Sequence, residues 1–159
     1  MNSEECKLKL LHYFRFFRKY NYIATEVGKF NSDVLVSNGE SIIEIEVKIS
    51  YADLKNELKK QKHKNYISPT KWYKQYLPNY YYFAIPEVMK EKASKYIYDN
   101  FPIYGLIIIK DLPIKRKISS CEIIKRPKSI TDNFSVKLQY QLLLRMGSEL
   151  IRGKLNGKN

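Results

Sequence analysis

Two glutamates and a lysine alternate with apolar residues in one short segment of the chain. In Ile42–Ile49, Glu44, Glu46 and Lys48 stand at every second position. Because alternate residues of a β-strand share a face, one face would be apolar and the other would carry these three charges. Carboxylates bind hard cations such as Mg²⁺, and a neighbouring lysine suits a phosphate or an attacking water. The chemistry would be metal-dependent phosphodiester hydrolysis; an ordinary charged surface strand is the alternative.

A hairpin just before this segment adds a third acid. The dipeptide Asn38-Gly39 is typical of a tight turn between two strands. With a two-residue loop, Asp33 would pair with Glu44 and lie diagonal to Glu46. With a four-residue loop, Asp33 would lie opposite Glu46. Both registers put Asp33 on the polar face, so we expect a carboxylate site for Mg²⁺, which Mn²⁺ could also occupy.

The elements that must position these residues alternate between helix and strand. Apolar periodicity and turn signals predict helices over Ser3–Tyr20, Tyr51–Tyr66, Glu87–Asp99 and from Thr131 onward, and strands over Tyr22–Val27, Asp33–Val36, Ser41–Ile49, Tyr80–Ile85, Tyr104–Lys110 and Ser119–Lys125. This alternation favours an α/β fold in which helices flank a sheet. We expect one domain over residues 1–159, with a core at about 22–112 and a C-terminal strand and helix extension at about 113–159.

The order of these motifs resembles the PD-(D/E)xK nuclease superfamily, and especially its MmcB-like and phage-encoded members. Asp33, followed thirteen residues later by Glu46-Val47-Lys48, is similar to the D…ExK signature of that superfamily. Further segments resemble its blocks in the same order: Ser32–Leu35, Glu46–Ser50 with Asp53, Lys71-Trp72 with Tyr76, Tyr82–Pro86 and Tyr104–Ile107. The resemblance covers about half of the chain, and it implies a restriction-endonuclease-like mixed β-sheet core flanked by helices.

The resemblance implies that the protein is a Mg²⁺-dependent endonuclease that hydrolyses DNA. Asp33 and Glu46 would bind the metal together with the main-chain carbonyl of Val47. Lys48 would orient the nucleophilic water and stabilise the charge that develops on the phosphate. Glu26 would support the metal through a water molecule.

The chain departs from the superfamily pattern in three respects. Ser32 replaces the proline of the "PD" pair, and Glu44 is an extra acid that could compete with Glu46 as the ligand. The segment before Lys71-Trp72 is also longer than in the MmcB-like members, which bears on the substrate more than on the chemistry.

The net charge of +13 indicates a polyanionic partner, and nucleic acid is the commonest one. Basic and aromatic side chains follow directly after the predicted catalytic strand, where phosphate contacts and base stacking are expected. The nucleic-acid-binding candidates are Lys55, Lys59, Lys62, His63, Trp72, Tyr73 and Tyr76. A solvated lysine face, an ordinary exposed histidine and core packing of the aromatic residues are the alternatives.

Other features narrow the class of protein. Cys6 and Cys121 lie too far apart for a CxxC pattern and are expected to be reduced thiols. The first residues do not form a secretion signal, and the apolar runs are too short to span a bilayer. We therefore expect a cytoplasmic protein of a bacterium or a phage-infected host cell. It would bind DNA rather than RNA, and it would not bind a membrane. A second copy of the chain, in a homodimer, is a further expected partner.

Two other functions fit the same sequence. One is a catalytically silent nucleic-acid-binding protein that keeps the fold for its shape. The other is an inhibitor or adaptor of a nucleic-acid enzyme, in which the basic surface is an interface and the acids are incidental.

Overall fold

A computed structural model describes residues 1–115 and 117–157. Six strands form one sheet in the order β1-β2-β3-β4-β5-β6. The strands are β1 (Tyr22–Val27), β2 (Ser32–Ser37), β3 (Ile42–Val47), β4 (Tyr80–Pro86), β5 (Gly105–Ile109) and β6 (Cys121–Lys125). Strands β1 to β3 are antiparallel, β3 to β5 are parallel, and β6 is antiparallel to β5. The expected α/β class, a mixed sheet flanked by helices, is confirmed.

Helices precede, connect and follow the strands. They are α1 (Ser3–His12), α2 (Tyr51–Asn56), α3 (Gln61–Ile67), α4 (Lys90–Asn100) and α5 (Val136–Asn156). A π-helical turn at Tyr13–Phe17 continues α1, and 3-10 turns lie at Glu57–Lys59, Tyr73–Tyr76 and Glu87–Met89. Helix α1 begins at Ser3, as predicted, and its N-cap is Asn2, whose side-chain oxygen accepts a hydrogen bond from the N–H of Glu5. None of the helices within the described part of the chain could cross a membrane.

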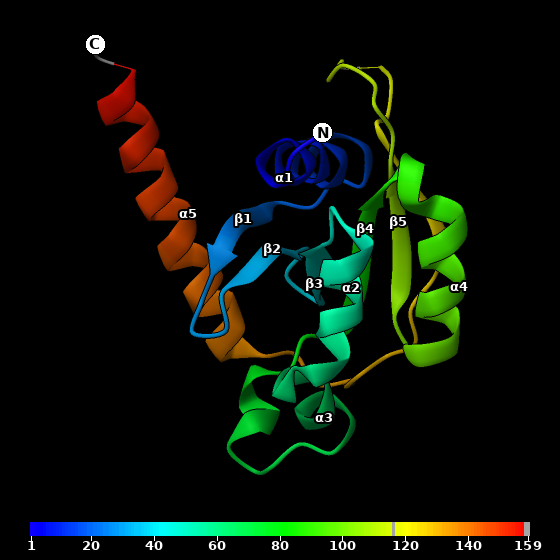
Figure 1. Ribbon diagram of the computed structural model, residues 1–159. Helices are drawn as coiled ribbons and strands as arrows, with labels where there is room; N and C mark the ends of the chain where they lie inside the picture. Colours follow the sequence, from blue (N-terminus) through cyan, green and yellow to red (C-terminus); the bar gives the residue numbers. More distant parts are fainter. Residues whose placement is uncertain (116, 158–159) are drawn as a thin grey trace.

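The helices cover the two faces of the sheet unequally (Figure 1). Helix α1 packs its apolar residues, including Leu10 and Phe14, against Val34, Ile45 and other side chains of one face. Helices α2, α3 and α4 pack on the opposite face, around aromatic residues such as Phe83. Helix α5 packs against β1 and β2 on that second face. The charged side of β3 therefore lies under helices instead of facing solvent.

The loop between β2 and β3 decides which register the acids adopt. Ser37 pairs with Ile42, so four residues, Asn38–Ser41, form the loop. Its Asn38 side chain accepts hydrogen bonds from two main-chain N–H groups of the loop, and Gly39 has a φ of 94°, which favours glycine. Continued by one step beyond the last recorded pair, this register puts Asp33 opposite Glu46. The four-residue alternative is therefore the one that the protein adopts.

Two expectations about the segment after β3 are wrong. Tyr51–Tyr66 is not one helix, because Lys60 has an extended conformation, with φ −72° and ψ 127°, between α2 and α3. The break lets Lys60, and Lys62 just after it, reach acids buried on the sheet. Ile49 was expected in the core, but β3 ends at Val47 and Ile49 is 44% exposed.

Candidate active site

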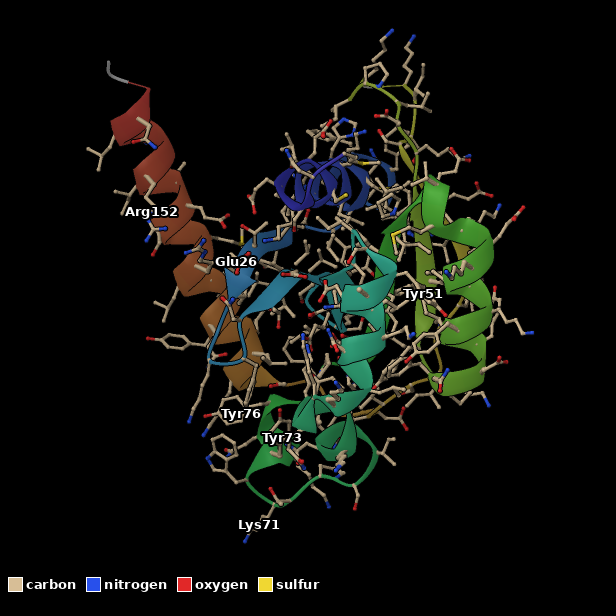
Figure 2. The ribbon with its side chains drawn as sticks, in the orientation of Figure 1. Glu26, Tyr51, Lys71, Tyr73, Tyr76 and Arg152 are labelled. Atoms are coloured by element: carbon tan, nitrogen blue, oxygen red, sulfur yellow. The ribbon has the colours of Figure 1, made fainter. Side chains whose placement is uncertain are left out.

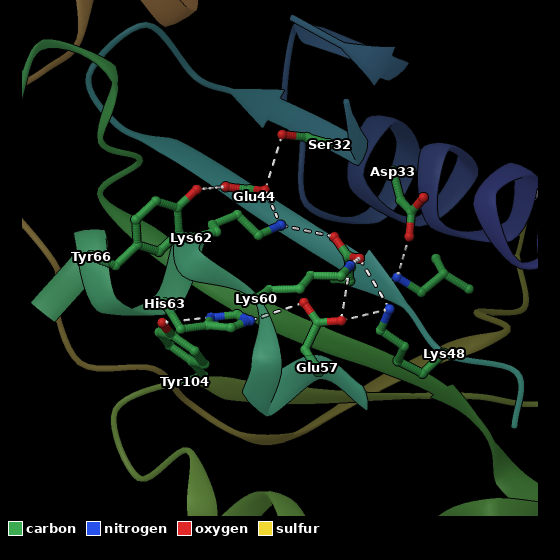
Figure 3. A network of polar contacts seen from close by, with 12 residues as sticks. Ser32, Asp33, Glu44, Lys48, Glu57, Lys60, Lys62, His63, Tyr66 and Tyr104 are labelled. Carbon is green, nitrogen blue, oxygen red and sulfur yellow. Dashed lines mark hydrogen bonds and ion pairs between the residues drawn. The ribbon is translucent and has the colours of Figure 1, made fainter. Parts of the chain in front are cut away.

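Glu46 is the most heavily paired acid on the sheet. Figure 3 shows its three lysine partners, Lys48, Lys60 and Lys62, in the surrounding network of polar contacts. Its side chain is 6% exposed, and its carboxylate oxygens lie 3.1 Å from Nζ of Lys48, 2.7 Å from Nζ of Lys60 and 3.0 Å from Nζ of Lys62. Burial alone would raise the pKa of Glu46, but the surrounding lysines, Lys62 foremost, lower it to about 2. Glu46 is therefore fully ionised at neutral pH and held by three ammonium groups.

Asp33 has different neighbours. Its Oδ2 accepts a hydrogen bond of 2.8 Å from the N–H of Val47, and its Oδ1 lies 3.8 Å from Nζ of Lys7. Burial and the negative charge of Glu46 raise the pKa of Asp33, and the hydrogen bond from Val47 and the nearby lysines only partly offset this. The carboxylates of Asp33 and Glu46 thus repel each other across the hairpin.

Glu26 lies on β1, at the position opposite Asp33 when the β1–β2 register is continued through the pairs on either side. Its carboxylate forms an ion pair with Lys7, the same lysine that approaches Asp33. Glu26 has a φ of 51°. Residues other than glycine rarely adopt this backbone conformation, which costs about 1–3 kcal/mol. Glu26, Asp33 and Glu46 therefore form one row across β1, β2 and β3.

Lys48 is buried between acids from two elements. Its Nζ lies 2.8 Å from Glu57 and 3.6 Å from Asp53, in addition to its contact with Glu46. Burial opposes its charge, but Glu46 and Glu57 outweigh that effect and raise the pKa of Lys48. Lys48 is therefore a permanent positive charge beside Glu46 and cannot serve as a general base near neutral pH.

The extra acid, Glu44, is a structural residue of the same face. It is 2% exposed and accepts hydrogen bonds from the Ser32 hydroxyl, the Lys62 ammonium and the Tyr66 hydroxyl. Serine at position 32, where the superfamily has proline, thus supplies a donor to a buried carboxylate. Glu44 pairs across the hairpin with Leu35, whereas Glu46 lies opposite Asp33, so Glu46 is the better candidate ligand.

His63 is buried, whereas both interpretations of the sequence expected it at the surface. Its ring nitrogens lie 3.0 Å from the Tyr104 hydroxyl and 2.9 Å from Glu57. Glu57 also pairs with Lys60 at 2.9 Å, so His63 helps to hold the acid that positions Lys48 and Lys60. Its position supports a positioning role and not a phosphate contact.

A pocket of about 360 Å³ opens over Glu46. Its walls include Lys60, Lys62, Asn65 and Tyr73, so a carboxylate and two ammonium groups face the same space. Larger hollows lie elsewhere on the surface, but this one contains a residue of the predicted catalytic core. The pocket could admit an anionic group next to Glu46.

The structure separates the predicted nucleic-acid-binding residues into two groups. Lys55, Lys59 and Trp72 are exposed, whereas Lys62, His63 and Tyr73 lie at least partly inside the fold and Tyr76 is half-buried. The break at Lys60 is the reason that the three lysines do not form one stripe. Tyr73 packs against Phe30 and Tyr66, so it is unable to stack on a base.

Trp72 lies in the loop after α3 that also contains Lys71, which points away from the body of the protein (Figure 2). Its ring is 45% exposed, packs against Tyr76 and carries the ammonium of Lys29 4.8 Å from its centroid. This loop therefore keeps an exposed aromatic ring among lysines.

Sequence reasoning missed three residues that shape the site. Lys7 was one polar residue among the apolar positions of α1, and Glu57 and Lys60 were part of a helix expected to be continuous. The balance of charge depends on them. Glu44, Glu46 and Glu57 face the three ammonium groups of Lys48, Lys60 and Lys62, with Asp53 also near Lys48, whereas Glu26 and Asp33 share the ammonium of Lys7 with the exposed Glu4. Asp33, which is 3.8 Å from the ammonium of Lys7, is therefore the least neutralised acid of the row.

The oxygen atoms around Asp33 and Glu46 meet some, but not all, of the requirements of a site for one hard cation. Two carboxylates and the main chain of Val47 lie near one another, and the raised pKa of Asp33 marks a place where a cation would be favourable. Against this, lysines occupy both oxygens of Glu46. Within residues 1–115 and 117–157, the acids, histidines and cysteines do not form a ready-made cluster of three metal ligands. A cation could bind here only if Glu46 exchanged its lysines for it.

No family model, curated protein or solved structure matches this chain. The resemblance to the PD-(D/E)xK superfamily therefore rests on the motif residues alone.

Proposed function

We propose that this protein is a divalent-metal-dependent nuclease that hydrolyses phosphodiester bonds of nucleic acid, DNA rather than RNA. The observation that carries the proposal is the hairpin register, which aligns Asp33 with Glu46 and places the Lys48 ammonium 3.1 Å from Glu46. The pocket over Glu46, with Lys60 and Lys62 in its walls, provides space for a phosphate at these residues.

Asp33 and Glu46 would hold Mg²⁺ or Mn²⁺ together with the main-chain carbonyl of Val47, and Glu26 would act through a water. A divalent ion bound there supplies a water of lowered pKa and neutralises charge on the phosphate. Burial and repulsion from Glu46 raise the pKa of Asp33, and a bound cation would relieve the repulsion. This relief supports the assignment of Asp33 as a ligand.

Lys48 would contribute electrostatically. Glu57 and Glu46 hold its ammonium in place, and its raised pKa keeps it charged throughout the neutral range. A fixed positive charge beside the reacting phosphate stabilises the charge that develops in the transition state without reorganisation. Glu57 and His63 would be positioning residues, because they act through Lys48.

Lys60 and Lys62 would connect substrate binding to the metal ligand. Both ammonium groups neutralise Glu46, and both line the pocket. A phosphate in the pocket attracts the same ammonium groups, so it would loosen their hold on Glu46 and free that carboxylate. Lys60 is better suited to this exchange than Lys62, because its side chain is 44% exposed and that of Lys62 only 11%.

Cleavage assays with plasmid, single-stranded DNA, a branched junction and RNA, each with Mg²⁺, Mn²⁺ or EDTA, test this function. The proposal expects cleavage that EDTA abolishes and that Asp33→Asn or Glu46→Gln removes while far-UV circular dichroism stays unchanged. Asp99→Asn, at an exposed position of α4, is the matched control and should keep full activity. Metal-dependent cleavage that survives in both site variants would contradict the assignment.

One observation favours a second function, that of a catalytically silent nucleic-acid-binding protein. Lysines already neutralise both oxygens of Glu46, so the face is charge-balanced and stable with no cation at Glu46. The protein would then bind DNA with and without EDTA equally well. Mg²⁺ titrated calorimetrically into the protein alone would give no heat of binding.

A further inference from the structure

Helix α5 has two apolar faces. Leu138, Leu142 and Met146 form the first and pack against the β1–β2 side of the sheet. The second consists of large apolar side chains that are 46–72% exposed, and their helix extends beyond the sheet in Figure 1. Its members are Val136, Tyr140, Leu143, Leu144, Leu150, Ile151 and Leu155.

The exposed residues form one continuous stripe. At about 100° of rotation per residue they fall within an arc of about 140°, on the side of the helix away from the buried face. Arg145 and Glu149, which contact each other and β1, lie outside that arc. A helix that only covered β1 would need a single apolar face, so the stripe is surplus to the fold of one chain.

Gly147 lies on the midline of this stripe. A Cβ placed there would meet no atom within 4 Å, so nothing inside the protomer requires glycine. Glycine within a helix costs about 1 kcal/mol relative to alanine. A small residue at the centre of an apolar stripe does permit another helix to approach closely, because interaxial distance depends on the side chains at the contact.

A two-fold axis through Gly147 would bring the residues before it in one copy against the residues after it in a second copy, and these residues are complementary. In an antiparallel pair centred there, Leu144 meets Leu150 of the second copy, and Leu143 meets Ile151. Lys154 meets the ring of Tyr140, a cation–π contact. A parallel pair would instead place Lys154 beside Lys154 of the other copy, with like charges adjacent.

The size of the stripe also fits a dimer. We estimate that the seven side chains expose on the order of 800 Å² per protomer, which is about what one partner contributes to a standard interface. The largest apolar patch on a typical monomer is smaller, about 300–600 Å². We propose that α5 forms a homodimer by antiparallel packing of this stripe against a second copy, centred on Gly147. The proposal does not depend on the nuclease chemistry.

The first test is the mass of the full-length protein in sedimentation equilibrium over a concentration series. We expect a dimer that Leu144→Glu/Ile151→Glu weakens at least about tenfold, because burying the charges without partners is unfavourable. Ser148→Glu, exposed and outside the arc, is the control and should leave association unchanged. Equal thermal melting of the wild-type and double-variant monomers at low concentration would show that the fold persists.

A glycine pair separates association from helix stability. Gly147→Leu and Gly153→Leu both introduce a better helix former at an open position, but only position 147 lies in the stripe. Gly147→Leu should weaken the dimer, and Gly153→Leu should not. Equal effects of the two variants would overturn the assigned crossing point.

Disulfide formation fixes the orientation. The native thiols of Cys6 and Cys121 are buried, and burial raises their pKa to about 11 and about 12, so they contribute little background. A mixture of Leu143→Cys and Ile151→Cys proteins should cross-link to each other, whereas each alone should not. Cross-linking of each variant with itself would indicate a parallel pair. A wild-type protein that stays monomeric at about 100 μM and instead sediments with lipid vesicles through this stripe would overturn the proposal.

Discussion

The ammonium of Lys60 lies 2.7 Å from Oε1 of Glu46. Lys60 is in the break between α2 and α3, and Glu46 is on β3, a central strand of the sheet. The acid proposed to bind a metal is thus paired with a side chain that is almost half exposed and able to move. If the proposed function holds, this pairing would couple metal binding and phosphate binding to the charge balance at Glu46.

Removing that ammonium should strengthen metal binding. Lys60→Gln removes one of the two ammonium groups at Oε1 of Glu46 and leaves Lys48 as its remaining partner. The dissociation constant for Mn²⁺ or Mg²⁺ should therefore fall about two- to fivefold, as expected for a partly exposed ion pair. Isothermal titration calorimetry measures it. Lys59→Gln, one residue earlier and exposed, is the control. An unchanged affinity in Lys60→Gln would mean that Lys60 does not compete with the metal.

Asp33→Asn should separate activity from stability. It removes a proposed ligand, so metal-dependent cleavage should be lost. It also removes a carboxylate whose pKa is raised by burial and by Glu46, so the free energy of unfolding at pH 7 without metal should rise. Urea unfolding in EDTA measures this change. Lower stability of Asp33→Asn in EDTA would show that the charge of Asp33 is compensated in the folded protein.

Acid should destabilise the protein through Glu46. Its pKa is about 2 in the folded protein against an ordinary 4.5, so ionised Glu46 stabilises the fold above pH 4.5, and that contribution is lost as the pH falls through 2. The contribution is on the order of 3 kcal/mol. Denaturant unfolding from pH 6 to pH 2 should have a shallower pH dependence in Glu46→Gln than in the wild type. Glu40→Gln, in the exposed hairpin loop, should follow the wild-type curve.

Lys62 should matter more for stability than any exposed lysine. Its ammonium lies 3.0 Å from both Glu44 and Glu46, so Lys62→Met leaves two buried carboxylates short of a partner and should cost about 3–5 kcal/mol. Lys59→Met should cost less than about 0.5 kcal/mol. Adding Glu44→Gln to Lys62→Met should recover part of the loss. Thermal and urea unfolding compare the variants, and the absence of any recovery would indicate that Glu44 does not depend on Lys62.

Single-stranded DNA should contact the exposed part of the loop after α3. Trp72→Ala should weaken binding of single strands about five- to a hundredfold, within the range for one stacked base, and duplex binding less. Lys71→Gln should reduce the slope of log affinity against log salt by about 0.7 per lost contact. Fluorescence anisotropy across a salt series measures both. Equal losses on single and double strands would mean that Trp72 acts through packing.

The amino-acid sequence by itself determined the local features of this protein. Period-two alternation in Ile42–Ile49 specified a strand with one charged face, and Asn38-Gly39 specified a hairpin. Every predicted strand is present, because strand patterns and turn residues act over a few neighbouring positions. The charged face was therefore predictable, and so was the alignment of Asp33 with one of two glutamates.

Only the tertiary structure decided what surrounds that face. The four-residue loop selected Glu46 as the partner of Asp33, and the break at Lys60 turned Lys60 and Lys62 toward the sheet. Helical periodicity could not indicate that break, since its cause is the pairing of buried acids distant in sequence. Ion pairs between Lys7 and Glu26, or Lys62 and Glu44, depend on which helix covers which strand, and packing of the whole chain determines that arrangement.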